Sequence, residues 1–230
     1  MPLRVAFDLD GTIADMHQVL RIEAEHLFGQ SAASAEPQPQ NAAEEERRGA
    51  VMRSEFALSR AQHAQLWDHV KGIANFWSRL PEMEPGIVAR IADAASAHRW
   101  DVIFLTTRPM VAGETVQVQT QRWLEAHGFA LPSVFVVQRS RGRIADALEL
   151  DAVVDDRPEN CLDVALDSKA TAILIWRAEQ GKVPLGLDRL SVRVMPSISD
   201  ALQMLIAIDQ QQRPGVVRTL RKLFRKETTA

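Results

Sequence analysis

The sequence predicts an α/β fold in which helices cover both faces of a parallel β-sheet. From residue 85 onward, short apolar runs alternate with helical patterns, as is typical of strands buried on both faces. Between the first and second predicted strands, residues 14–84 carry helical patterns and no convincing strand. We therefore expect a small helical cap inserted after the first strand.

Each predicted element follows from its local pattern. The first strand is the apolar run 3–7, and helical spacing follows over residues 14–28. Residues 30–48 lose this periodicity and predict a flexible loop, after which residues 50–77 return to a helical pattern. The later predicted strands are 101–105, 134–137, 152–154, 171–176 and 192–194. The helices predicted between and after them are 86–98, 114–127, 140–148, 159–165 and 198–210.

These elements predict three parts of the 230-residue chain. Residues 1–13 and 85–210 form the expected core, residues 14–84 the cap, and residues 211–230 a basic C-terminal tail. In the tail, cationic and apolar residues alternate as in an amphipathic helix, which is compatible with weak contact to an anionic surface or a partner. A loosely docked terminal helix is the alternative interpretation.

The composition limits the functional classes. Hydrophobic residues make up 46% and charged residues 25% of the chain, as in soluble globular proteins. The net charge of −3 gives no basic excess, so we expect no nucleic-acid partner. The single cysteine, Cys161, excludes an intrachain disulfide and favours a reducing compartment. No signal peptide and no apolar run of about 18 residues is visible, so we expect a cytoplasmic protein without a transmembrane segment.

Acidic and hydroxyl side chains follow three of the predicted strands. The carboxyl ends of parallel strands meet at one edge of a sheet, so these side chains should converge there. Clustered carboxylates repel one another, and Mg²⁺ relieves that repulsion because it binds hard oxygen ligands and substrate phosphate. We therefore expect Mg²⁺ and a small phosphorylated substrate. The six residues are Asp8, Asp10, Thr106, Thr107, Asp155 and Asp156.

The spacing of Asp8 and Asp10 fits two distinct chemical roles. One carboxylate can attack phosphorus and form an aspartyl-phosphate, while a second can donate and accept protons as a general acid and base. Gly11 permits a sharp turn after the strand. Hydrogen bonds to the phosphoryl oxygens can come from Thr12, from nearby amides and from Thr106.

Three motifs resemble those of the haloacid dehalogenase (HAD) superfamily. Asp-Leu-Asp-Gly-Thr at 8–12 resembles its first motif, Leu-Thr-Thr-Arg at 105–108 its second, and residues 153–160 its fourth. The acids followed by Arg-Pro, together with residues 76–81, are similar to the 5′-nucleotidase type C branch. The resemblance covers residues 1–13 and 85–205. It implies a Rossmannoid core with a cap and Mg²⁺-dependent phosphatase activity.

The resemblance also implies individual roles. Asp8 would be the nucleophile and a metal ligand. Asp10 would be the acid and base, and would bind metal through its backbone carbonyl. Thr106 would bind phosphate. Asp156 would be the better candidate for direct contact with the metal, and Asp155 would be the second candidate.

The third motif departs from the family pattern. It is usually a lysine before the fourth motif, but no lysine lies between Lys71 and Lys169. Arg141 and Arg143 are the available cations, and we prefer Arg141 for the catalytic role because of its spacing to the fourth motif. We assign Arg143, together with Thr107, Gly11 and Thr12, to substrate binding.

Two functions remain open at this stage. The first is hydrolysis of a small phosphomonoester, with a nucleoside monophosphate as a candidate substrate. The second is a non-catalytic module that binds a metal or phospholigand, with the cap as an interaction surface. The intact Asp8 and Asp10 pair favours the enzyme, while the missing lysine favours the module.

Several other side chains have structural interpretations. We expect the core of the cap to contain the aromatic side chains Trp67, Phe76 and Trp77. The alternative is that they line a surface that binds a base. We expect Cys161 to be buried and to act as a small hydrophobic side chain. The six histidines show no zinc-binding spacing.

Overall fold

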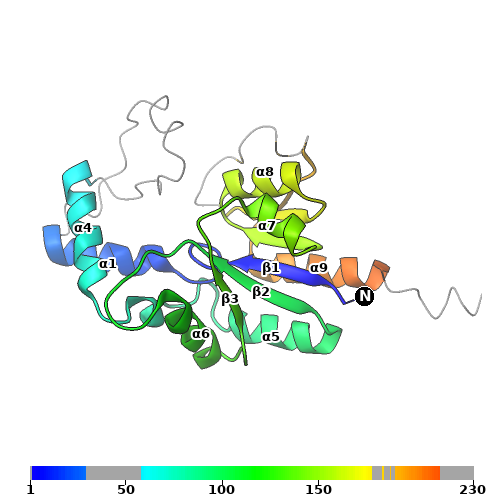
Figure 1. Cartoon of the computed structure of the whole chain (residues 1–230), viewed down its shortest axis with the longest axis horizontal. Helices are drawn as coiled ribbons and strands as arrows, with labels where there is room; N and C mark the ends of the chain where they lie inside the picture. Colours follow the sequence, from blue (N-terminus) through cyan, green and yellow to red (C-terminus); the bar gives the residue numbers. More distant parts are fainter. Residues whose placement is uncertain (1, 30–57, 178–182, 184–186, 188–189, 213–230) are drawn as a thin grey trace, which may run out of the picture.

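The computed structural model describes residues 2–29, 58–177, 183, 187 and 190–212 (Figure 1). The predicted flexible loop 30–48, the first part of the predicted helix 50–77, and nearly all of the predicted tail 211–230 lie outside these residues.

The described core contains one six-stranded parallel sheet with the strand order β3-β2-β1-β4-β5-β6. The first strand is therefore central, between β2 and β4. This confirms the predicted parallel α/β fold. The strands are β1 Arg4–Asp8, β2 Asp101–Thr106, β3 Ser133–Val136, β4 Ala152–Asp155, β5 Thr171–Ile175 and β6 Arg193–Met195.

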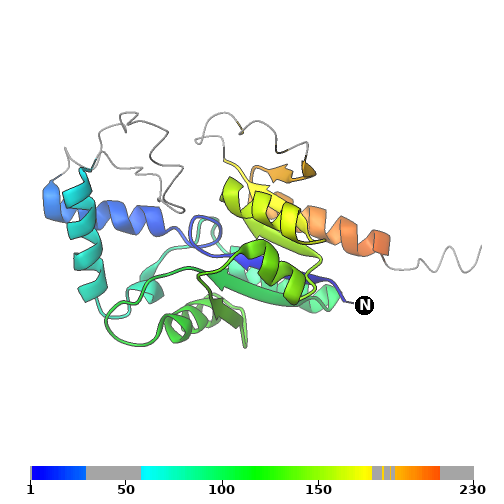
Figure 2. The same ribbon diagram turned by 45° about the horizontal axis from the view of Figure 1, so that its top comes forward.

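Helices cover both faces of this sheet because successive strand residues point to opposite sides. Phe7 and Phe104 pack on one face with α5 (Ile87–His98), α6 (Val116–Ala126) and α9 (Ile198–Gln212). Ala6 and Leu105 pack on the other face with α7 (Arg141–Ala147) and α8 (Pro158–Asp167). Figure 2 shows α7 and α8 together on their side of the sheet.

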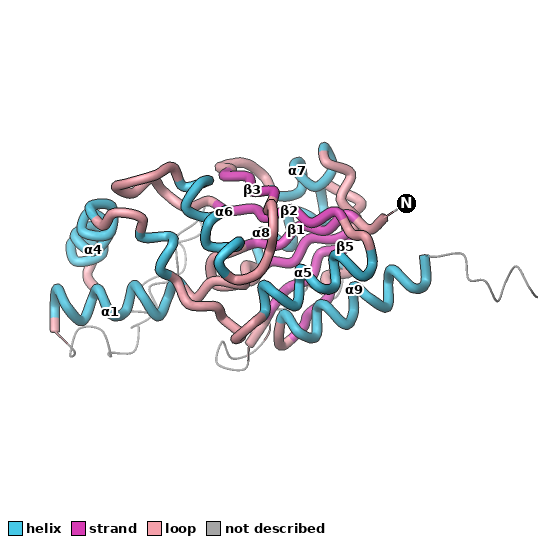
Figure 3. Tube along the Cα trace, turned by 90° about the horizontal axis from the view of Figure 1, so that it is seen from below, coloured by secondary structure: helices cyan, strands magenta, loops and turns pink. Residues whose placement is uncertain are grey.

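Two helices of the inserted segment lie beyond one end of the sheet (Figure 3). These are α1 (Met16–Phe28) and α4 (Arg60–Gly72). They pack against one another, and each buries apolar side chains in the main core cluster, including Leu20 of α1 and Leu66 of α4. Asp15 caps the start of α1 by accepting a hydrogen bond from the amide of Gln18.

The two connections between the cap helices and the sheet are hydrogen-bonded to each other. The amide of Asp15 donates to the carbonyl of Pro81 at 2.9 Å, and the amide of Met83 donates to the carbonyl of Ile13 at 2.7 Å. The chain therefore leaves and re-enters the core at one place, immediately beyond the end of β1.

The helix predicted to continue to residue 77 ends at Gly72, which corrects that prediction. Asn75 adopts a left-handed conformation with φ 54°, and a short 3-10 helix, η2 (Phe76–Arg79), follows. Phe76 and Trp77 are fully buried and η2 packs on α6, because the core gains more from these large apolar side chains than from a further helical turn. Both aromatic residues are buried as predicted, but in the main core cluster rather than in a separate core of the cap. Trp67 is partly buried against the same cluster.

Gly142 lies where α7 packs closely on α8, so a larger residue there tests this contact. A Cβ atom at this position would lie against the backbone carbonyl oxygen of Asp163 and 2.7 Å from the Cβ of Asp167. We expect Gly142→Ala to lower the free energy of unfolding by about 1–3 kcal/mol, because the two helices must separate. Urea denaturation measures the change.

Gly72→Ala is the matched control. It changes the same residue type at the end of α4, where an added Cβ meets nothing within 4 Å. We expect it to change the free energy of unfolding by less than about 1 kcal/mol. Equal effects of the two substitutions would contradict a tight α7–α8 contact.

Candidate functional site

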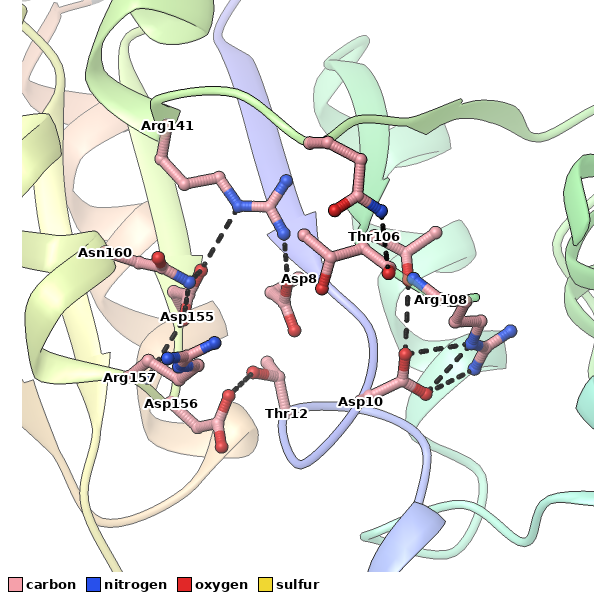
Figure 4. Close-up of polar contacts among 12 residues, drawn as sticks. Asp8, Asp10, Thr12, Thr106, Arg108, Arg141, Asp155, Asp156, Arg157 and Asn160 are labelled. Carbon is pink, nitrogen blue, oxygen red and sulfur yellow. Dashed lines mark hydrogen bonds and ion pairs between the residues drawn. The ribbon is translucent and has the colours of Figure 1, made fainter. Parts of the chain in front are cut away.

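The predicted site residues gather at the carboxyl ends of β1, β2 and β4. Asp8, Thr106 and Asp155 are the last residues of these three adjacent strands. The strand registers pair Phe7 with Val154 and Asp8 with Leu105. Asp8 therefore lies beside Asp155, and Thr106 lies one residue further along β2. Figure 4 shows that their side chains point into a common region.

Three carboxylates form the centre of the site. Asp8, Asp155 and Asp156 each offer one oxygen atom, and these atoms all lie within 4.8 Å of one another. The donor set consists entirely of carboxylate oxygens, which are the ligands that Mg²⁺ prefers. The residues present therefore fit a hard divalent cation.

Arg141 is the cation that contacts this cluster. Its Nη2 atom donates to Oδ1 of Asp8 at 2.6 Å, and its Nε atom lies 3.7 Å from Oδ2 of Asp155. The side chain is 3% exposed, and its buried Nη1 atom has no hydrogen-bond partner among the described residues. A buried guanidinium N–H without a partner is costly, and an anionic ligand would satisfy it.

The position of Arg141 is fixed from the neighbouring helix. The carboxylate of Asp163 on α8 accepts hydrogen bonds from the hydroxyl of Ser140 and from the amide of Gly142. The Ser140 hydroxyl in turn accepts from the amide of Arg143 and caps α7. Together these bonds fix the start of α7 and orient Arg141 towards β1.

Burial raises the pKa values of all three carboxyl groups, and neighbouring carboxylates raise those of Asp8 and Asp156 further. Burial, and then the charge of Asp155, raise the pKa of Asp8 well above its ordinary value, although Arg141 opposes this shift. Burial raises the pKa of Asp155, again opposed by Arg141. Burial and the charge of Asp155 raise the pKa of Asp156 to about 7. Although Arg141 and Arg157 both lower the pKa of Asp155, the raised pKa values indicate that the cluster is short of positive charge.

Local hydrogen bonds orient the two acids of the fourth motif. The carboxylate of Asp155 accepts from the amide of Arg157 at 2.9 Å and from Nδ2 of Asn160 at 2.9 and 3.1 Å. Oδ1 of Asp156 accepts from the hydroxyl of Thr12 at 3.0 Å. Gly11 has φ 84°, and a Cβ there would lie against the Asp156 carboxylate. A glycine is therefore needed where the first and fourth motifs meet.

Asp10 forms a second group beside the three carboxylates. Its oxygens accept from Nε of Arg108, both at 2.9 Å, and Nη2 of Arg108 lies 2.8 Å from Oδ1. The hydroxyl of Thr106 donates to Oδ2 of Asp10 at 3.1 Å. In Figure 4 the Asp10 carboxylate points to Arg108 rather than to Arg141. Metal binding through the backbone carbonyl of Asp10 stays a prediction.

The structure does not bring two of the predicted residues into the cluster. Arg143 is 84% exposed at its side chain and lies 3.9 Å from Asp167, because residues two apart in a helix face different sides. Thr107 is exposed, and its backbone carbonyl accepts a hydrogen bond from Gln138. Of the two candidate cations, only Arg141 reaches Asp8.

Sequence reasoning missed three residues that the structure places here. Arg108 and Asn160 lie inside the second and fourth motifs, and the structure pairs them with Asp10 and Asp155. Arg177 directly follows β5 and donates to the carbonyl oxygens of Gly11 and Thr12 at 2.8 and 3.0 Å. Its position after a strand was the available signal. Cys161 is buried beside the carbonyl of Asp155, as expected for a small hydrophobe.

Comparison with solved structures identifies the fold. A hydrolase from Pseudomonas syringae matches with a TM-score of 0.51 at 15% identity, over 90% of this chain and 99% of that one. A haloacid dehalogenase-like hydrolase from Streptococcus pneumoniae matches with 0.51 at 14% identity, over 89% and 98%. A predicted phosphatase from Clostridium acetobutylicum matches with 0.52 at 13% identity, over 90% and 99%. This chain has a haloacid dehalogenase-like fold. The HAD-like core expected from the motifs is thus confirmed as a fold.

Other comparisons add little to this result. No protein-family model matches the sequence, and no curated protein matches it. Among the described residues, no helix is both long enough and apolar enough to cross a membrane.

The raised pKa of Asp156 predicts how Mg²⁺ binding varies with pH. Without metal, the folded protein retains a proton on Asp156 up to about pH 7, whereas the unfolded chain loses it near the ordinary value of 3.8. This group therefore favours folding most at low pH, and the benefit falls as the pH rises towards 7. Mg²⁺ must displace the proton, so the increase in melting temperature that it causes should grow through about pH 7.

Thermal denaturation with and without Mg²⁺, at about pH 6 and about pH 8, checks this prediction. Asp156→Asn is the control, because it removes the titrating group, and we expect it to weaken the Mg²⁺ effect at the higher pH. An equal Mg²⁺ effect at both pH values in the unchanged protein would contradict the assignment of Asp156 as a ligand.

Proposed function

We propose that this chain is a magnesium-dependent phosphohydrolase that cleaves a small phosphomonoester through an aspartyl-phosphate on Asp8. One observation carries the proposal. Asp8 is buried at the end of the central strand, contacts the buried cation Arg141, and belongs to a cluster of three carboxylates that fits a divalent cation. Phosphoryl transfer needs a positioned nucleophile and positive charge around the phosphoryl oxygens, and this arrangement can supply both.

The metal would be held by side-chain oxygens of Asp8, Asp155 and Asp156, and by the backbone carbonyl of Asp10. When bound, Mg²⁺ supplies positive charge that offsets the carboxylates and the phosphoryl group. Asp156 is the better candidate for direct contact than Asp155. Asp155 already accepts three hydrogen bonds from Arg157 and Asn160, which occupy part of its carboxylate.

In the first step, an oxygen of Asp8 attacks phosphorus as the bond to the leaving oxygen breaks. Asp10 gives its proton to that leaving oxygen, so the product departs as an alcohol. Arg141 and Thr106 donate hydrogen bonds to the phosphoryl oxygens. Asp8 then carries the phosphoryl group as a mixed anhydride.

In the second step, water replaces Asp8 at phosphorus. Asp10, now a carboxylate, takes a proton from the water molecule as its oxygen attacks. The bond between phosphorus and Asp8 breaks, inorganic phosphate leaves, and Asp10 again holds the proton required for the next cycle. Asp8 therefore carries the phosphoryl group and Asp10 carries the proton, despite the identical chemistry of the two groups.

Nucleoside monophosphates are the first substrates to test. The support for this choice is the similarity of the paired acids and of residues 76–81 to the 5′-nucleotidase type C branch. We further propose that the cap, residues 14–84, contacts the leaving group, because α1 and α4 lie beyond the end of the sheet at which β1 carries Asp8 (Figure 1). A cytoplasmic setting is part of the same proposal, supported by the single buried cysteine.

Substituting the two first-motif acids separates their roles. Asp8→Asn removes the attacking oxygen and should abolish both turnover and phosphoenzyme formation. Asp10→Asn removes the proton carrier and should slow turnover by ~10²–10⁴-fold, while some phosphoenzyme still forms from p-nitrophenyl phosphate. A rapid acid quench followed by mass spectrometry of the first-motif peptide measures the phosphoenzyme.

Label on Asp10, or full activity in Asp8→Asn, would overturn the assignment of the nucleophile. The wild-type protein supplies the control in a screen of phosphorylated metabolites with and without Mg²⁺. If no phosphomonoester in that screen were hydrolysed in a Mg²⁺-dependent manner, the result would favour the non-catalytic binding module.

A further inference from the structure

Arg108 is a buried cation whose contacts differ from those of Arg141. Its side chain is fully buried, and Nε and Nη2 both face the carboxylate of Asp10. Its Nη1 atom donates to the hydroxyl of Thr120 on α6 at 2.9 Å. The guanidinium thus bridges the first-motif turn and the helix that follows β2.

One further contact holds the guanidinium in place, and hydrogen bonds fix the ring that makes it. Its central carbon lies 4.9 Å from the centre of the Trp77 ring, in a cation–π contact. The indole N–H of Trp77 donates to the carbonyl of Pro109, and its backbone amide donates to the side chain of Gln119. A planar donor that is held on several sides can fix the plane of a carboxylate, which a flexible ammonium cannot do as well.

We propose that Arg108 is a positioning residue that orients the carboxyl group of Asp10 for proton transfer. This inference rests on the proposed function. Arg108 faces Asp10 and Thr120, whereas the ion pair of the nucleophile Asp8 is with Arg141. Arg108 therefore acts on the reaction through Asp10.

The hydrogen bonding of Thr106 shows why Asp10 needs a second partner. In this structure the Thr106 hydroxyl donates to Asp10, but the proposed reaction uses the same hydroxyl for the phosphoryl group. When that hydroxyl turns to phosphate, Asp10 loses one of its donors and keeps Arg108. A misplacement of about 1 Å in a catalytic group can cost ~10²-fold in rate, so the remaining contact matters.

The main test is Arg108→Gln, studied with two substrates. We expect kcat/KM for an alkyl phosphate to fall by about ten- to a hundredfold, the range seen when a partner that orients a catalytic group is removed. The loss should be smaller for p-nitrophenyl phosphate, because its leaving group departs without a proton. A burst of p-nitrophenol should precede a slow steady state, because water activation is also impaired.

A double-mutant cycle with Asp10→Asn distinguishes positioning from general support of the fold. If Arg108 acts through Asp10, adding Arg108→Gln to Asp10→Asn should cause little further loss of kcat/KM. If Arg108 only supports local packing, the two losses should multiply, and that outcome would overturn the inference. Arg122→Gln is the matched control. It breaks an exposed ion pair with Glu114 near the same helix, and we expect unchanged kinetics.

Two milder variants keep the test decisive if Arg108→Gln does not fold. Arg108→Lys retains the charge and should recover part of the loss. Thr120→Val removes only the contact to Nη1 and should lower the alkyl-to-aryl ratio of kcat/KM by a smaller factor. An unchanged ratio in both folded variants would refute the positioning role. Failure of the wild type to hydrolyse any phosphomonoester in the metabolite screen would instead refute the proposed function.

Discussion

The burial of several carboxylates beside the end of one central strand is the constraint on which the rest of the site depends. Asp8, Asp155 and Asp156 lie close together, and the charge of Asp155 raises the pKa values of the other two. The permanent cation Arg141 contacts Asp8, and its position depends on the packing of α7 on α8. Residues that never touch a ligand, such as Asp163, therefore influence the charge balance of the site.

Much of the fold and of the acidic cluster could be predicted because both depend on local patterns. Apolar runs and the residues after them show where strands end, and the parallel arrangement then brings Asp8, Thr106 and Asp155 together without any long-range information. The choice of Arg141 over Arg143 followed from spacing, and helix geometry explains why one reaches Asp8 and the other faces Asp167.

The missed features depend on contacts between distant segments. The helix before Trp77 ends early because that side chain packs on α6, about 40 residues further along the chain, and no local pattern reports such packing. The ion pair between Asp10 and Arg108 could not be predicted from the sequence either. Arg108 was visible in the second motif, but its direction depends on Thr120 and Trp77. Sequence thus located the charged groups, whereas tertiary packing decided which of them pair.

The two paired connections beyond β1 have a consequence for how this protein can change over evolutionary time. Hydrogen bonds join Asp15 to Pro81 and Met83 to Ile13, so the inserted segment begins and ends at one closed junction. A segment anchored in this way can lengthen, shorten or be replaced while the junction and the strand end stay in place. Apart from Trp77, which contacts Arg108, selection can therefore act on the insertion while the acidic centre is kept, so one chemistry can be retained while the accepted molecule changes.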